Sequence, residues 1–177
     1  MENQYFNNNN NNYNYDNNYN YILNNNYISL ITLDDISQIN YISTAYWGYD
    51  GLYDFDDLKN VICQNLSFCI KIKFEIIGFC LVSKINDFKC EIFLIAVKPG
   101  FINMKFGNKI LSYCIQNAHK NGIKIIQLHV SKTNEPAIHL YSNLGFKVVR
   151  TIKKYYKTLI TFNENDRDAY IMRLNKF

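Results

Sequence analysis

The sequence lacks a CxxC pair, and its five cysteines would leave one residue over in any complete set of disulfides. No cysteine and histidine spacing fits a zinc site, so we expect no bound metal. We therefore expect reduced and mostly buried cysteines in an intracellular protein.

Long hydrophobic runs are also missing. The apolar stretch at residues 92–97 has the length of a strand, whereas crossing a bilayer takes about 20 residues. No basic segment and apolar segment precede the asparagine tract, so we expect no secretory signal and a cytoplasmic location. Basic residues are scattered and the net charge is only +4, which gives no indication of nucleic-acid binding.

The amino-terminal residues are rich in asparagine and tyrosine instead of aliphatic residues. Six consecutive asparagines stand at positions 7–12. Such a tract cannot bury enough apolar surface to fold, so we expect a disordered tail at residues 1–26. The remaining residues, 27–177, are expected to form one domain.

Hydrophobic periodicity and turn residues predict the element order βααβββαβαββ. The expected strands are 28–33, 68–73, 76–84, 90–97, 123–130, 146–156 and 169–174, and the expected helices are 34–45, 56–65, 107–120 and 135–144. Asp34 or Asp35 is expected to cap the first helix, and residues 46–55 are expected to form a loop. The β–α–β unit from Cys90 to Val130 predicts a parallel strand pair inside a mixed α/β (α+β) sheet.

Two segments carry a family resemblance. Residues 96–101, Ala-Val-Lys-Pro-Gly-Phe, resemble the strand-end motif Val-x-Pro-x-Tyr of the GNAT acetyltransferase superfamily. Residues 134–146 resemble its motif Asn-x-x-Ala-x-x-x-Tyr-x-x-x-Gly-Phe. The resemblance implies the GNAT fold, in which a splayed parallel strand pair is flanked by helices, and acetyl transfer from acetyl-CoA to an amine.

Within the superfamily the chain is most similar to the San-type (NatE) N-terminal acetyltransferases. Leu128-His129-Val130 and the paired tyrosines within residues 153–157 carry this similarity. It implies acetylation of a peptide or nascent-chain N-terminus, and it suggests the ribosome and other N-terminal acetyltransferase subunits as partners.

The expected pyrophosphate loop departs from the family pattern Arg/Gln-x-x-Gly-x-Gly/Ala. At residues 102–107 only Gly107 matches, because Ile102 replaces the Arg or Gln and Lys105 replaces the first Gly. Phosphates at such sites are held largely by backbone N–H groups, which survive substitution. The alternative is a loop that has lost cofactor binding. The resemblance implies contacts with acetyl-CoA from Ala96, Val97, Lys105, Gly107, Asn108, Asn134 and Tyr141.

Three side chains are candidates for proton transfer. The resemblance implies a catalytic histidine at His129, whose usual pKa of about 6.5 suits a general base. Glu91 falls where the San-type enzymes carry a tyrosine, and it could accept a proton through water. Tyr141 matches the tyrosine that protonates the departing thiolate. Each has a structural alternative: a hydrogen-bonded core histidine, a solvated strand-end charge, and a core aromatic.

The acceptor would lie between two aromatic segments, with Tyr155 and Tyr156 on a late strand and Tyr46 and Trp47 in the opposite loop. Adjacent strand residues point to opposite faces, so at most one of the paired tyrosines should line the cleft unless the strand bends. Two other functions stay open: a non-catalytic subunit that keeps the fold, and an acetyltransferase for lysine or small amines.

Overall fold

The computed structural model describes residues 28–47, 54–156 and 167–175 of the chain, with the side chain of Trp47 excepted. The expected tail at residues 1–26 lies outside this part, so its disorder stays a prediction.

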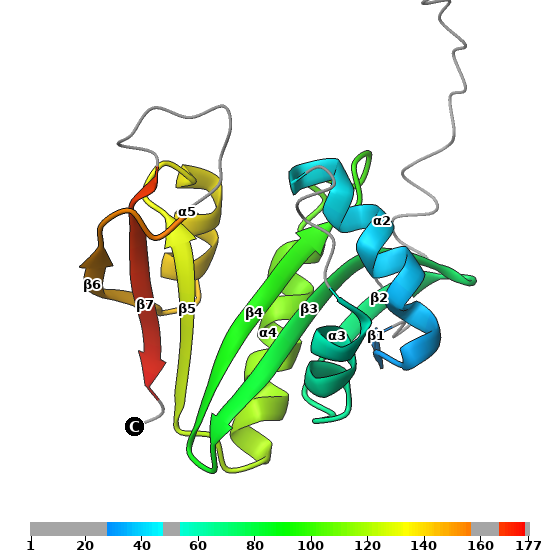
Figure 1. The fold of residues 1–177 in the computed structure, drawn as a ribbon, viewed down its shortest axis with the longest axis horizontal. Coiled ribbons are helices and arrows are strands. Elements are labelled where there is room, and N and C mark those ends of the chain that lie inside the picture. Colours follow the sequence, from blue (N-terminus) through cyan, green and yellow to red (C-terminus); the bar gives the residue numbers. More distant parts are fainter. Residues whose placement is uncertain (1–27, 48–53, 157–166, 176–177) are drawn as a thin grey trace, which may run out of the picture.

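A seven-stranded mixed sheet forms the centre of the described molecule (Figure 1). The strand order is β1-β2-β3-β4-β5-β7-β6, and every neighbouring pair is antiparallel except the parallel pair β4–β5. The strands are β1 (Ile28–Leu30), β2 (Phe68–Ile72), β3 (Glu75–Asn86), β4 (Lys89–Val97), β5 (Ile125–Ser131), β6 (Lys147–Ile152) and β7 (Ala169–Asn175). This sheet confirms the predicted fold class and its parallel pair.

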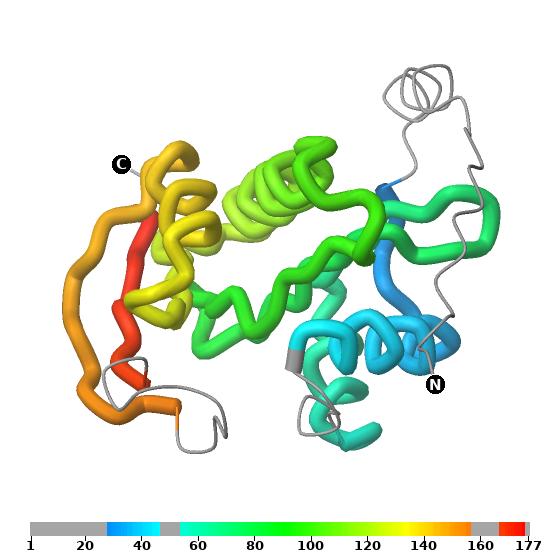
Figure 2. The backbone as a smooth tube through the Cα atoms, turned by 90° about the horizontal axis from the view of Figure 1, so that it is seen from above, coloured from blue at the N-terminus to red at the C-terminus, as the bar shows by residue number. Residues whose placement is uncertain are grey.

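Helices cover both faces of the sheet, as seen from above in Figure 2. The helical elements are η1 (Leu33–Asp35), α2 (Ile36–Trp47), α3 (Phe55–Ile62), α4 (Phe106–Lys120) and α5 (Glu135–Asn143). Helices α2 and α3 lie on one face, whereas α4 lies on the other. The apolar stripe of α4, which includes Ile110, Leu111 and Cys114, is fully buried, as its helical spacing requires.

Two hydrophobic cores result, one on each face of the sheet, and a bulge in β4 lets this strand contribute side chains to both. Leu81 pairs with Leu94 while Val82 pairs with Ile92, so Phe93 is the extra residue of β4. Ile92 accordingly packs in the core beneath α4, whereas Leu94 packs in the core beneath α2 and α3. The bulge thus reverses the faces to which β4 side chains point.

The parallel strands stay in register for only a short distance. Their last residue pair is Ile92 with Leu128. Beyond it, β4 continues to pair with β3 and β5 with β7, so the two halves of the sheet separate in a V (Figure 1). A parallel pair that separates is the arrangement that the family resemblance implied.

The predicted start of the first helix is wrong by a few residues. The first strand ends at Leu30, and Thr32, not Asp34 or Asp35, is the N-cap. The backbone N–H and the hydroxyl of Thr32 both donate to the Asp35 carboxylate, which also pairs with Lys71 Nζ at 2.7 Å. Asp35 therefore closes a capping box from the third helical position, a role that its position beside another aspartate concealed.

The sequence also predicted the wrong secondary structure for two segments, each of which carries a pair of aromatic residues. Tyr46 and Trp47 belong to the last turn of α2 and not to a loop. Strand β6 ends at Ile152, so Tyr155 and Tyr156 follow the strand instead of lying on it. A turn with a left-handed residue, Lys154 at φ 53°, separates them from β6.

The cysteines are free, and Cys69, Cys80, Cys90 and Cys114 are buried while Cys63 is exposed. This confirms the expectation of mostly buried cysteines, and their reduced state stays a prediction. Among the described residues, no helix combines the length and the apolar character that a bilayer crossing requires.

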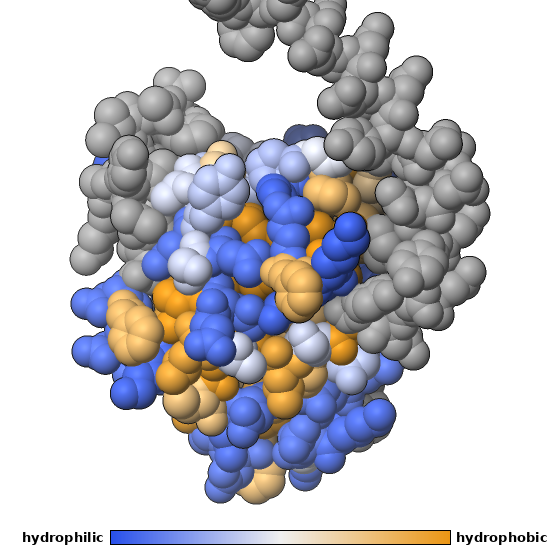
Figure 3. Space-filling model, turned by 90° about the vertical axis from the view of Figure 1, so that its right-hand side faces the viewer, coloured by the Kyte–Doolittle hydropathy of each residue, from blue (hydrophilic) through white to orange (hydrophobic). Residues whose placement is uncertain are grey.

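The face beyond the β1 edge mixes hydrophobic and hydrophilic side chains (Figure 3). A shallow cavity of about 190 Å³ lies between α2 and the start of β3, and its lining includes Tyr41, Glu75 and Lys98. The charged groups of the cavity, Glu75 and Lys98, form an ion pair with each other. This cavity is separate from the residues assigned to chemistry.

Candidate active site

Glu91 and His129 meet where the parallel strands begin to separate. Glu91 of β4 pairs with Gln127 of β5, and His129 lies two residues further along β5 on the same face. The Glu91 Oε1 atom lies 2.8 Å from His129 Nδ1. The side chains of Glu91 and His129 are 25% and 17% exposed, so both are largely shielded and still reachable. The structure thus brings together two of the three residues predicted for proton transfer.

Tyr155 covers the His129 ring. The two rings are stacked, with centroids 4.7 Å apart and planes only 4° from parallel. Burial raises the pKa of the Tyr155 hydroxyl, and the nearby Glu91 carboxylate raises it further. Tyr155 therefore remains a neutral phenol at neutral pH and can donate a hydrogen bond.

The segment that carries Tyr155 is held by Asp168, the residue directly before β7. The backbone N–H of Lys154 donates to Asp168 Oδ1 at 3.0 Å, and Asp168 Oδ2 lies 3.7 Å from Lys132 Nζ. Tyr156 and Arg167 then exchange hydrogen bonds through the Tyr156 backbone. The chain after β6 is thereby directed across the sheet toward His129.

Tyr141 and Tyr156 form the next aromatic group. Tyr141 is 6% exposed on α5 and packs within the core beneath α4. Burial raises its pKa strongly, with smaller contributions from Cys80 and Tyr156. Tyr155 and Tyr156 lie edge to face with centroids 5.0 Å apart, and Tyr155 stacks on His129. Because both tyrosines follow β6, the alternation of side chains along a strand does not apply to them, and their contact with an acceptor stays a prediction.

Two polar side chains at the site were missed from the sequence. Gln127 Nε2 donates to Glu91 Oε2 at 3.3 Å, and Arg173 Nε donates to Gln127 Oε1 at 3.3 Å. Gln127 is 8% exposed. The sequence signal was its position two residues before His129, which places both side chains on one face of β5. Nothing in the sequence connects Arg173 to them.

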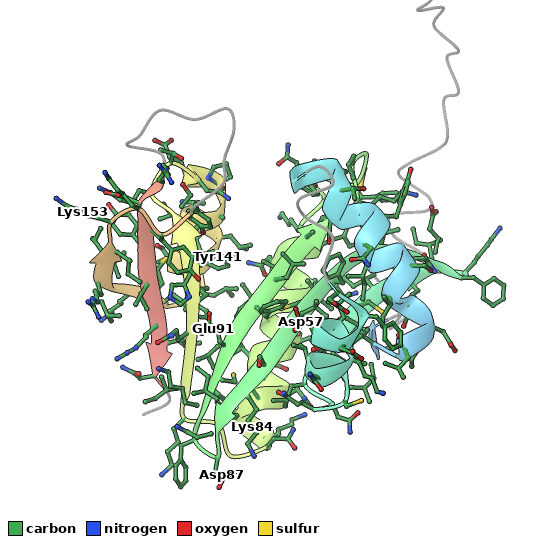
Figure 4. All side chains as sticks on the ribbon, in the orientation of Figure 1. Asp57, Lys84, Asp87, Glu91, Tyr141 and Lys153 are labelled. Atoms are coloured by element: carbon green, nitrogen blue, oxygen red, sulfur yellow. The ribbon has the colours of Figure 1, made fainter. Side chains whose placement is uncertain are left out.

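Figure 4 shows Glu91 low on the sheet near the junction of β4 and β5, and Tyr141 above it on α5. Lys153 lies beyond β6, at the outer edge of the sheet. Glu91 and Tyr141 therefore both lie near β5, away from the outer edge that carries Lys153 (Figure 4).

The loop after β4 leads into the amino terminus of α4. Lys105 is the N-cap residue, has φ 61°, and makes no side-chain capping bond. Asn103 also has positive φ, at 66°. A Cβ on Gly107 would contact Leu140 and Val97 side-chain atoms at 3.6 and 3.7 Å, which are ordinary contacts. The Gly/Ala alternative in the family pattern is therefore physically reasonable at position 107.

The remaining proposed residues surround this loop. The Tyr46 hydroxyl donates to the Val97 carbonyl at the end of β4, and burial raises its pKa. Ala96 is buried in the core beneath α2 and α3, so its contribution is limited to its backbone. Asn108 is exposed in the first turn of α4. The side chain of Trp47 lies outside the described part of the chain.

Asn134 is the N-cap of α5. Its side chain accepts a hydrogen bond from the Ala137 backbone N–H at 3.2 Å. The capping role is thereby confirmed for this residue, and its contact with acetyl-CoA stays a prediction.

Comparisons with known proteins identify the class. The model of the acetyltransferase (GNAT) family matches residues 33–146, and the chain belongs to this family. It is an acetyl-CoA-dependent N-acetyltransferase.

Particular relatives support the same assignment. The [ribosomal protein bS18]-alanine N-acetyltransferase of Escherichia coli (strain K12) is 29% identical over 111 residues, which are 63% of this chain and 72% of the relative. Ard1 of Thermoplasma volcanium shares the fold with a TM-score of 0.72 and 20% identity, covering 85% of this chain and 97% of that one. Arabidopsis thaliana Naa50, solved with the bisubstrate analogue CoA-Ac-MVNAL, has a TM-score of 0.72 and 19% identity, with 84% and 97% covered.

The residues present fit acetyl-CoA. The first backbone N–H groups of an α-helix have no partner within the helix, and Lys105 leaves those of α4 without a side-chain cap. An anion is favoured there by the helix dipole as well. The pairing of β4 with β5 ends at Ile92 and Leu128, next to Glu91 and His129.

Proposed function

We propose that this acetyltransferase acts on the free α-amine of a peptide or protein, with His129 as the general base and Glu91 as its hydrogen-bonding partner. The 2.8 Å contact between Glu91 Oε1 and His129 Nδ1, at the mouth of the separated strands, carries the proposal. The name of the bacterial relative, which assigns it an alanine of a ribosomal protein, supports a protein acceptor.

The hydrogen bond between Glu91 and His129 defines which nitrogen accepts the proton. An ionised carboxylate only accepts hydrogen bonds, so the shared proton belongs to His129 Nδ1. The other ring nitrogen, Nε2, is left with its lone pair and takes the proton of the attacking amine, directly or through water. Glu91 then stabilises the imidazolium ring that forms, as an orienting carboxylate does beside other catalytic histidines.

Acetyl-CoA supplies the activated acetyl group and a thiolate leaving group. The amine forms the new C–N bond while the C–S bond breaks, and one proton moves from the amine to His129. Tyr141, kept as a phenol by its raised pKa, can donate a hydrogen bond to the departing thiolate, and the thiolate takes its proton from solvent. In this proposal the chain provides a base, His129, and a hydrogen-bond donor, Tyr141.

The tyrosines support a preference for a chain end. Tyr155 stacks on His129 and Tyr156 lies beside it, so the wall of the acceptor site is aromatic with hydroxyl donors. Such donors can bind carbonyl groups of a peptide whatever its side chains are. A free α-amine beside a peptide backbone satisfies this wall better than a lysine side chain does.

Acetylation of two matched peptides tests the acceptor. One carries a free α-amine, and the other has the same sequence with a blocked α-amine and an internal lysine. We expect acetylation mainly of the first. Equal rates on both peptides would assign the protein to lysine acetylation instead.

Substitution of the two central residues tests the mechanism. Positioned general bases contribute about 10²–10⁴-fold to rate, so His129→Ala and Glu91→Gln should lower kcat strongly while KM for acetyl-CoA changes little. His139→Ala, at an exposed position on α5, is the matched control and should retain activity. Unchanged kcat in both site variants would assign Glu91 and His129 to structure alone.

A further inference from the structure

Gln127 is a buried amide whose two ends are both occupied. Its Nε2 atom donates to Glu91 Oε2, and its Oε1 atom accepts from Arg173 Nε, each at 3.3 Å. The strand order places these residues side by side, because Gln127 of β5 pairs with Glu91 of β4 and with Arg173 of β7. A row of hydrogen bonds therefore crosses three strands and ends at His129 Nδ1.

We propose that Gln127 and Arg173 are positioning residues that hold the Glu91 carboxylate, and through it the His129 ring, in the orientation required for proton abstraction. This inference rests on the proposed function, in which His129 is the base. Neither residue has to touch the acceptor or acetyl-CoA.

Arg173 determines which end of the Gln127 amide faces Glu91. The oxygen and nitrogen ends of an amide have nearly the same shape, so packing alone does not distinguish them. A guanidinium group has only donors, and it therefore requires the amide oxygen on its side. The NH₂ group is then directed at Glu91, where the opposite orientation would place two acceptors against each other.

With the Gln127 contact, each Glu91 oxygen accepts a hydrogen bond from a different residue. Oε2 accepts from Gln127 and Oε1 from His129, so the carboxylate cannot rotate without breaking one of the two bonds. The His129 ring is thereby held with Nδ1 toward Glu91 and Nε2 toward the acceptor. Its plane is fixed independently by the stacked Tyr155 ring.

Two substitutions of Gln127 test whether its hydrogen bond to Glu91 matters apart from the space that its side chain fills. Gln127→Glu keeps the shape and the acceptor for Arg173, but it replaces the donor toward Glu91 with a carboxylate oxygen that repels the Glu91 carboxylate. Gln127→Leu removes both polar ends and keeps an apolar side chain that suits a buried position. Because hydrogen bonds to charged groups are the stronger ones, we expect both variants to lose about tenfold to a hundredfold in kcat, with KM for acetyl-CoA unchanged. Gln116→Leu, on the exposed side of α4, is the matched control and should behave as wild type.

Arg173 should act only through Gln127. Arg173→Met is expected to lower kcat in the same direction, and the double variant Gln127→Leu/Arg173→Met should be no slower than Gln127→Leu alone. Arg150→Met is the matched control, since Arg150 is an exposed residue of β6 paired with Ile171, two residues from Arg173. It removes the same charge from the neighbouring strand and should leave kcat unchanged.

A measurement without acetyl-CoA separates positioning from a loss of folding. The ¹⁵N chemical shifts of the histidine ring nitrogens report which nitrogen carries the proton. In the wild-type protein we expect His129 to hold its proton on Nδ1. In both Gln127 variants we expect a mixture of the two tautomers, while the spectrum of His139 stays unchanged.

The outcomes distinguish this proposal from the proposed function. If the wild-type protein acetylates no peptide α-amine, the proposed function fails, and the tautomer measurement still decides whether Gln127 orients His129. A fixed Nδ1 proton together with full kcat in Gln127→Leu would overturn the positioning role. An Arg173→Met effect that adds in full to that of Gln127→Leu would overturn the order of action.

Discussion

Replacing Lys105 with glycine should make the protein more stable and its binding of acetyl-CoA weaker. Lys105 adopts φ 61°, a conformation that costs a residue with a Cβ about 1–2 kcal/mol and costs glycine nothing comparable. Against this gain stands the extra freedom of glycine in the unfolded chain, about 0.4–1 kcal/mol. The net increase in the free energy of unfolding is about 0.5–1 kcal/mol. For a chain of 177 residues, this corresponds to a rise in Tm of about 1–4 °C.

The effect on acetyl-CoA has the opposite sign, because the same substitution removes a charge. Lys105 is exposed at the amino terminus of α4 and forms no ion pair within the described residues, so its ammonium group can reach a phosphate. An exposed ion pair of this kind contributes at most about 1 kcal/mol, which is about fivefold in Kd. Lys105→Met removes the charge and keeps the Cβ, so it should weaken binding by a similar factor without the gain in stability.

Thermal unfolding without ligand and isothermal titration with acetyl-CoA measure the two effects separately. Asn103→Gly is the matched control, since Asn103 has a similar φ of 66° without a charge. Because asparagine tolerates this conformation, its replacement should change both Tm and Kd little. Tighter binding by Lys105→Gly than by wild type would show that the Cβ obstructs the phosphates more than the ammonium group attracts them, and would refute this reasoning.

Three further predictions concern the aromatic, cysteine and capping residues. Tyr141→Phe should lower kcat and leave KM for the peptide unchanged. Because burial raises the Tyr141 pKa, ionisation of Tyr141 should not lower the wild-type kcat below about pH 10. A fall in kcat below that pH that is present in the wild type and absent in the variant would contradict this. A thiol reagent such as Ellman's reagent should rapidly modify only Cys63 in the native protein, because Cys63 is the exposed thiol. Burial raises the Cys90 pKa to about 12, which slows the reaction of that thiol. Fast modification of the Cys63→Ser variant would refute this prediction. Asn134→Ala should lower the free energy of unfolding by about 1 kcal/mol through loss of the α5 cap, and unchanged denaturant midpoints would exclude that role.

Local patterns predicted most of the fold because the elements depend on nearby residues. The stripe of α4 is followed by Gly122 at φ 84°, and α5 is followed by Gly145 at φ 90°, which are conformations that glycine adopts readily. Strand β4 was predicted from its apolar run, but the bulge at Phe93 was not, since it appears only in the pairing with β3. The predicted helix boundary was wrong where a side chain inside the helix caps its first residues, as the Asp35 carboxylate does by accepting from the Thr32 backbone N–H.

The site could be predicted only in part, because its contacts join distant positions. The family motif placed His129, and the position of Glu91 followed by alignment. Their partners Gln127 and Arg173 are brought together by the strand order, which inserts β7 beside β5. The stacking of Tyr155 depends on a turn that is held by Asp168, fourteen residues from the Lys154 backbone. Such contacts follow from the assembled sheet and have no local sequence pattern.

The departures from the family pattern have different consequences. A substitution matters less where the backbone binds the ligand than where the side chain performs the chemistry. At Ile102 and Lys105 the pattern serves a phosphate site made chiefly of N–H groups, which the turn into α4 still presents. At Glu91 the replaced residue has a chemical role, and glutamate can fill it only if a partner orients it. The structure provides that partner in His129 and a second donor in Gln127. Under the proposed function, His129 is the proton acceptor, and the glutamate at position 91 supports it through this hydrogen bond.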